Sequence, residues 1–134
     1  MADLEGFVTA LPDLWDGDPA IADFPRDRRF EGLLAEVGGQ AVENKLAVLN
    51  LAAQYLEPGE VYLEAGAFRG VSICAAALGN SDKQFVTVDN FSQFGGPEEE
   101  CRTNIARWAD GNVDLVDSSI WAYLPRVSAP EPGP

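Results

Sequence analysis

The stretch from Val61 to Ser72 reads V-Y-L-E-A-G-A-F-R-G-V-S and constrains the fold more than any other part of the chain. Its first three residues form a short apolar run typical of a strand, and Gly66 and Gly70 bound a tight turn before an Ala-rich stretch. The sequence therefore predicts a strand, a loop and the start of a helix in direct succession. Such a junction directs backbone N–H groups and the positive end of a helix dipole toward one point, which suits a carboxylate or phosphate.

The spacing of the glycines narrows the class of ligand. A dinucleotide loop of the G-x-G-x-x-G type needs two further glycines where this chain has Phe68 and Val71. Their bulk would press against a pyrophosphate, and the G-K-[ST] signature of a nucleoside triphosphate site is missing. We therefore expect a smaller anion, such as an amino-acid carboxylate, held by loop amides and the hydroxyl of Ser72.

Polar residues also follow two further predicted strands. The strand predicted at 84–88 ends at Asp89, about one βαβ unit after Glu64. An acid in this position can accept hydrogen bonds from two ribose hydroxyls. The strand predicted at 113–116 ends before the polar residues 117–119, which offer groups for reading an adenine edge. Three successive strands would thus end at one rim.

These segments resemble a known family. E-A-G-A-F-R-G-V-S, V-T-V-D-N-F and V-D-L-V-D-S-S are similar to the first three signature segments of class I S-adenosylmethionine-dependent methyltransferases, with the nearest likeness to small-molecule O-methyltransferases. The resemblance covers residues 41–125. It implies an α/β fold with a Rossmann-like, doubly wound parallel sheet, here incomplete, with about three strands in the order 3-2-1 and helices before them.

The resemblance also implies a site for S-adenosyl-L-methionine. In the family the glycine loop holds the methionine part, the acid after the second strand holds the ribose, and residues after the third strand border the adenine. Carried over to this chain, the methionine part is lined by Gly66, Ala67, Gly70 and Ser72. Glu64 lies near its ammonium group, Asp89 binds the ribose, and Ser118 and Ser119 border the adenine.

Simpler roles remain open for several of these residues. Glu64 also suits a helix-capping acid, and Ser72 suits the N-terminal cap of the helix that it begins. Ser118 and Ser119 are of a type common in solvated loops. The methyltransferase interpretation therefore depends on the three segments occurring together and in order.

The family pattern stops after the third strand. A class I methyltransferase continues with a fourth strand whose tip carries an acidic segment near the transferred methyl group, whereas residues 125–134 read P-R-V-S-A-P-E-P-G-P. Prolines fix φ and remove backbone donors, so we expect residues 126–134 to form an extended, disordered tail. We expect a methyltransferase truncated before its catalytic half, acting on a small-molecule acceptor, and we assign no catalytic residue. Its metal dependence is undecided.

A missing fourth strand has a consequence for the first one. The run Val61–Leu63 would form an open hydrophobic sheet edge, which is a template for pairing with another chain. We expect the chain to dimerise along this edge, to cover it with its N-terminal segment, or to be marginally stable. The alternative function is a non-catalytic nucleotide- or cofactor-binding module that associates through this edge.

Composition excludes several partners. The 134-residue chain carries 22 acids against 9 bases, for a net charge of −13, which argues against nucleic acid and anionic membranes. It has no membrane-spanning apolar run and no signal peptide, so we expect a cytoplasmic protein. It has no histidine, which excludes imidazole catalysis, and its two cysteines form no metal cluster. We predict a helical N-terminal cap segment over residues 1–40 and a partial cofactor-binding domain over residues 41–125.

Overall fold

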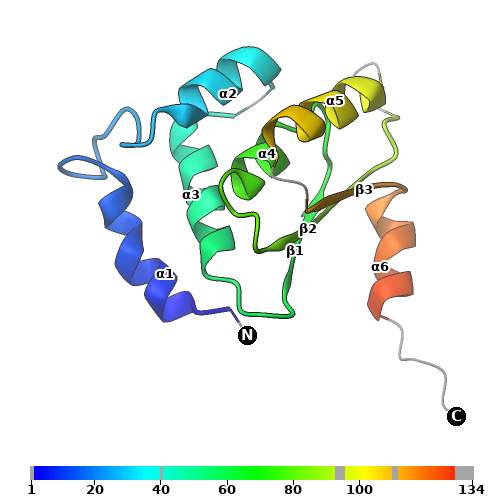
Figure 1. Ribbon diagram of the computed structural model, residues 1–134, viewed down its shortest axis with the longest axis horizontal. Coiled ribbons are helices and arrows are strands. Elements are labelled where there is room, and N and C mark those ends of the chain that lie inside the picture. Colours follow the sequence, from blue (N-terminus) through cyan, green and yellow to red (C-terminus); the bar gives the residue numbers. More distant parts are fainter. Residues whose placement is uncertain (1, 40, 93–95, 110–111, 129–134) are drawn as a thin grey trace, which may run out of the picture.

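The structure is a computed structural model that describes residues 2–39, 41–92, 96–109 and 112–128, drawn in Figure 1. Three strands alternate with helices after an N-terminal helical segment. In chain order the elements are α1 Leu4–Ala10, the 3₁₀-helix η1 Leu11–Leu14, α2 Arg29–Val37, α3 Glu43–Gln54, β1 Val61–Ala65, α4 Val71–Ala77, β2 Gln84–Asp89, α5 Glu98–Trp108, β3 Val113–Asp117 and α6 Ile120–Ser128.

The three strands form one parallel sheet in the order β1-β2-β3. This is the predicted order 3-2-1, read from the opposite edge. Parallel neighbours require a crossover connection, which α4 provides between β1 and β2 and α5 between β2 and β3. The register places Ala65 beside Val88 and Asp89 beside Asp117, so the three strands end at the same edge. The α/β class and the parallel sheet predicted from the sequence are confirmed.

Helix α4 is the centre of the core. Six of its seven residues are buried, and most of them are small, so neighbouring elements can approach it from several sides. Phe30 and Leu33 of α2 and Leu46 of α3 pack in one cluster with the outer side of α4. Its inner side packs against the sheet residues Tyr62 and Phe85. The sheet is therefore covered on this face by α4 and α5, with α2 and α3 forming an outer layer (Figure 1).

The N-terminal segment lies on the outer helices. Helix α1 lies beside α3, on the side away from the sheet, and α2 shares one hydrophobic core with α3 and α4 (Figure 1). The indole N–H of Trp15 donates a hydrogen bond to Asn44 Oδ1 at 2.8 Å, which ties the segment to α3. Neither α1 nor η1 covers β1, so the expectation that this segment closes the sheet edge is wrong for its described helices.

Strand β1 is an edge of the described sheet and pairs there with β2 alone. Val61 and Leu63 are 51 % and 42 % exposed, whereas Tyr62 points to the helix side. Alternate residues of a strand face opposite sides of the sheet, so Val61, Leu63 and Ala65 share the face opposite α4. The exposed hydrophobic edge expected from the sequence is therefore present in the described structure.

Helix α6 corrects the prediction for the end of the chain. It continues through Pro125 to Ser128, where the sequence predicted the start of an extended tail. The hydroxyl of Ser119 caps the first turn of α6, and the helix packs against β2 on the face of the sheet opposite α4. These two interactions stabilise the helix although Pro125 lacks the backbone N–H that would donate to the preceding turn. Residues 129–134 of the predicted tail lie outside the described residues. No described helix is long and apolar enough to cross a membrane.

Candidate functional site

The loop between β1 and α4 is a tight turn that requires glycine at both ends. Gly66 and Gly70 have φ angles of 91° and 94°, in the left-handed region that favours glycine. The N–H of Gly66 donates to Val88 O at 2.7 Å, which fastens the loop to β2, and the N–H of Gly70 donates to Ala67 O at 2.8 Å. A Cβ at position 70 would lie 3.2 Å from Cys101 Sγ, so close packing against α5 also requires glycine there.

Asp89, at the end of β2, connects this loop with the next one. Its Oδ2 accepts a hydrogen bond from the N–H of Phe68 at 2.9 Å, and its Oδ1 accepts one from the N–H of Phe91 at 2.8 Å. Both phenylalanines have positive φ angles, 48° and 56°, which cost about 1–2 kcal/mol for a residue with a Cβ. Hydrogen bonds to a carboxylate are strong enough to offset this cost. Asp89 therefore holds the backbone of Phe68 and of Phe91, one in each of the two loops that meet at the sheet edge.

The end of β3 is joined to the same point. The N–H of Ser118 donates to the carbonyl oxygen of Asp89 at 3.2 Å. Ser119 caps α6, because its Oγ accepts a hydrogen bond from the N–H of Ala122 at 3.1 Å. The Ser118 hydroxyl donates to the Ser119 carbonyl at 3.0 Å. Both serines therefore have structural roles, and their backbone holds the start of α6 beside β2.

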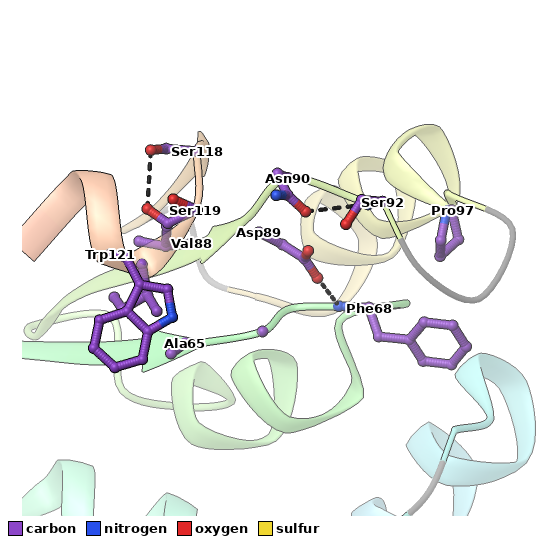
Figure 2. Close-up of a pocket in the computed structure, with 12 residues that line it drawn as sticks. Ala65, Phe68, Val88, Asp89, Asn90, Ser92, Pro97, Ser118, Ser119 and Trp121 are labelled. Atoms are coloured by element: carbon purple, nitrogen blue, oxygen red, sulfur yellow. Dashed lines mark hydrogen bonds between the residues drawn. The ribbon is translucent and has the colours of Figure 1, made fainter.

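These loops surround a cavity of about 440 Å³ at the carboxyl ends of the strands, shown in Figure 2. This volume is within the range of small-molecule sites. Polar groups of Asp89, Asn90 and Ser92 line one part, and apolar side chains of Val88 and Ile120 line another. The lining residues are Ala65, Gly66, Phe68, Val88, Asp89, Asn90, Ser92, Pro97, Ser118, Ser119, Ile120 and Trp121. The carboxyl edge of a parallel sheet is where ligands of α/β proteins bind.

Four of the eight predicted site residues line this cavity: Gly66, Asp89, Ser118 and Ser119. The other four, Glu64, Ala67, Gly70 and Ser72, do not line it. Ala67 is 5 % exposed, and it lies with Gly70 and Ser72 farther along the turn into α4. The N–H groups of Gly66, Phe68 and Gly70 are already bonded within the protein, so these three do not form the anion site expected from the glycine loop.

Glu64 lies on the sheet face that packs against the helices. Its Oε1 accepts a hydrogen bond from the Thr87 hydroxyl at 3.0 Å. Burial raises the pKa of Glu64 to about 7, and the nearby charge of Asp89 also raises it. The Thr87 hydrogen bond and the positive charge of Lys45 act in the opposite direction. Glu64 is therefore a partly buried carboxyl beneath the loop, and among the described residues its side chain bonds to Thr87 of β2 and not to a helix N-terminus.

Several lining residues were missed by the sequence reasoning. Asn90 and Ser92 lie in the first three positions after Asp89, and this place just after a strand-ending acid was a signal that would have identified them. Ile120 and Trp121 belong to the first turn of α6, where the sequence favours a short turn or helix over 119–124 but gives no sign that it borders the cavity. Within the described ranges, no group of three His, Cys, Asp or Glu side chains is placed to hold a metal ion.

Comparisons with known proteins do not assign this chain to a family. No protein-family model matches it, and searches of curated proteins and of solved structures give no match either. The functional interpretation therefore depends on the residues and on the geometry of the cavity.

Proposed function

We propose that the cavity binds S-adenosyl-L-methionine, and that the chain is the cofactor-binding part of a class I methyltransferase with a small-molecule acceptor. The observation that carries this proposal is the position of Asp89. Its carboxylate ends the central strand of the sheet, lines the cavity and is held by backbone N–H groups from the loops on both sides. In a Rossmann-like, doubly wound sheet, an acid at this position binds ribose hydroxyls.

The other walls of the cavity fit the remaining parts of a nucleoside. Ser118 and Ser119 lie beyond Asp89, at the end of β3, where the base of a nucleoside bound at Asp89 would extend. Gly66 lies on the other side, at the end of β1, where the amino-acid part would begin. The acidic surroundings favour a cofactor that carries an ammonium and a sulfonium group.

The chemistry of the proposed reaction would come from the cofactor, which supplies an activated methyl group. The described residues would bind and orient the nucleoside, and alignment of reactants is a large source of rate in such transfers. We assign no catalytic residue, because no described side chain in the cavity is a base positioned against an acceptor. A cytoplasmic location, expected from the sequence, stays part of this proposal.

Calorimetry with S-adenosylmethionine and S-adenosylhomocysteine tests the proposal. We expect the wild-type chain to bind both ligands. We expect Asp89→Asn to bind them with a free energy of binding that is less favourable by about 1–3 kcal/mol, because one carboxylate oxygen, an acceptor, is replaced by an amide NH₂, a donor. Asp114→Asn is the matched control, since Asp114 is exposed on β3 and does not line the cavity. Absence of binding at millimolar ligand would refute the cofactor assignment.

A second ligand separates the ribose contact from damage to the loops. We expect 2′-deoxy-S-adenosylhomocysteine to bind the wild type more weakly than the parent compound, and Asp89→Asn to lose this discrimination. An equal preference for the ribose hydroxyl in both proteins would show that Asp89 acts on the loops and not on the ligand.

The exposed edge of β1 favours a second candidate function, association with another copy of the chain. Antiparallel pairing of two β1 strands about a two-fold axis would extend the sheet and bring together the exposed Val61 and Leu63 side chains of each copy. Sedimentation equilibrium of Leu63→Lys tests it, with Val42→Lys as the control because Val42 is 64 % exposed outside the sheet. A wild-type chain that stays monomeric at high micromolar concentration removes this candidate.

A further inference from the structure

The two edges of the described sheet differ in charge. Strand β3 carries two exposed carboxylates, Asp114 and Asp117. Strand β1 carries no exposed charge, because its one charged residue, Glu64, lies on the helix side and bonds to Thr87. Charged side chains on an edge strand oppose pairing with another chain, and two paired β3 strands would bring carboxylates of equal charge together. Of the two edges, β1 is therefore the one suited to pairing with a second copy.

One hydrogen bond shows which backbone groups of β1 are directed outward. The N–H of Gly66 donates to Val88 O at 2.7 Å, so the backbone of Gly66 faces β2. Backbone N–H and C=O groups alternate between the two sides of a strand, so those of residues 62 and 64 also face β2. The N–H and C=O groups of Val61, Leu63 and Ala65 therefore point to the open edge. A partner strand can form hydrogen bonds to all three residues there.

Side chains at the same positions belong to an apolar patch. Val61 and Leu63 are exposed on the sheet face opposite α4. Helix α6 packs against β2 on this face and adds Trp121 and Leu124, which are 83 % and 38 % exposed. Figure 2 shows the Trp121 indole near Ala65, at the end of β1. A group of large exposed apolar side chains on one face indicates an interaction surface.

We propose that two copies of the chain pair their β1 strands antiparallel about a two-fold axis at Leu63, so that each copy borders the cavity of the other. In this register Leu63 meets Leu63 of the second copy, and Val61 of each copy pairs with Ala65 of the other. All three outward-facing residues of both strands then have partners, whereas a shift by two residues leaves one residue of each strand unpaired. Because the axis is perpendicular to the sheet, these side chains all stay on the face opposite α4.

The second copy would also contact the cavity wall. Ala65 and Trp121 both line the cavity, and in this register Val61 of the second copy lies beside Ala65 on the same face. The Trp121 indole, which is open to solvent in a single copy, would pack on that valine. The inference rests on the second candidate function and adds the register and the contact with the cavity. The net charge of −13 on each copy opposes association, so we expect association to strengthen with salt.

Crosslinking of cysteine variants with a short bismaleimide, at high salt, tests the register. Val61→Cys and Ala65→Cys should give a crosslinked dimer when they are mixed and little when each is alone, whereas Leu63→Cys should crosslink alone. Ile21→Cys is the control for random collision, since Ile21 is 80 % exposed outside the sheet. The native cysteines are buried and are common to all variants. A mixture that crosslinks no better than Val61→Cys alone would refute the register, even where sedimentation shows that the wild type associates.

Tryptophan fluorescence tests the contact with the cavity wall. As the protein concentration rises, the emission of the wild type should shift to shorter wavelength, because the indole of Trp121 moves from water into an apolar contact. Trp121→Phe should lose this shift, since the other two tryptophans bond to Asn44 and Glu36, outside the apolar patch. Trp121→Ala should weaken association by about 10-fold in sedimentation equilibrium.

The outcomes separate the inference from the functions on which it rests. Association of the wild type without a fluorescence shift that depends on Trp121 would refute the contact with the cavity wall and leave the second candidate function standing. A wild type that is monomeric at high micromolar concentration and high salt would refute both. The binding of S-adenosylmethionine is measured on its own, so the cofactor proposal does not depend on either result.

Discussion

Replacing Glu64 with Gln is expected to remove a pH-dependent loss of stability. The pKa of Glu64 is raised from its ordinary value of 4.5 to about 7 in the folded protein, mainly by burial. The unfolded chain therefore releases this proton at a lower pH than the folded chain. Between these two values the folded state binds more protons than the unfolded state, so stability falls as the pH rises.

The magnitude follows from the two pKa values. At about 1.4 kcal/mol per pH unit, a rise from 4.5 to about 7 corresponds to about 3 kcal/mol between the acidic and the alkaline limits. Most of this difference, about 2–3 kcal/mol, develops between about pH 5 and pH 8. Glutamine has no ionisation to lose, and its side-chain oxygen can still accept the hydrogen bond from Thr87. The variant should therefore be more stable than the wild type at pH 8.

Urea unfolding followed by circular dichroism measures this effect across the pH range. The free energy of unfolding of the wild type should fall relative to that of Glu64→Gln by about 2–3 kcal/mol as the pH rises. Glu99→Gln is the matched control, because Glu99 is exposed on α5 and its replacement removes one negative charge from the net charge of −13, as Glu64→Gln does. A constant difference between the wild type and Glu64→Gln at every pH would refute the assignment of a raised pKa to Glu64.

Two further predictions concern the packing that supports the site. In urea unfolding, Gly70→Ala should destabilise the protein by about 1–3 kcal/mol more than Gly66→Ala. Both glycines have a positive φ, so that cost is shared, but only a Cβ at position 70 meets another atom, Cys101 Sγ at 3.2 Å. Equal effects would show that α5 moves away without cost. Asn50→Ala should cost about 2–3 kcal/mol in the same assay, since the buried amide of Asn50 donates to two carbonyls at 2.8 and 2.7 Å near the end of α4. A change below about 0.5 kcal/mol would mean that water replaces these bonds.

The three strands were predictable from local sequence features, whereas their order was expected only from the family resemblance. Each strand contains a short apolar run that has an acidic residue at or next to its end, Glu64, Asp89 and Asp117. The segments between the strands are long enough to hold the helix that a parallel crossover requires. Asp89 was predictable as a cavity residue, because an acid at the end of a central parallel strand must lie at the carboxyl edge of the sheet, where the cavity is found. The exposure of Leu63 followed from the small number of strands.

Tertiary packing decided the features that the sequence did not reveal. Helix α6 continues past Pro125 although proline has a low helix propensity. The helix as a whole is supported by its contact with β2, which a reading of single residues does not reveal. The place of Ala67 depends on how sharply the chain turns at Gly66, and spacing along the sequence contains no information on this angle. The contribution of Trp121 to the cavity depends on how α6 lies against β2, which the sequence alone does not specify.

Asp89 links the stability of the loops to the proposed ligand site. Its two carboxylate oxygens each accept one backbone N–H, from Phe68 and from Phe91. Because a carboxylate oxygen has two lone pairs, each oxygen can still accept a second hydrogen bond. Two adjacent ribose hydroxyls would therefore add to the existing bonds and would not displace them. Because Phe68 and Phe91 are already bonded to Asp89, binding of a nucleoside would not require these two backbone positions to be fixed, and such preorganisation raises affinity without any further contact.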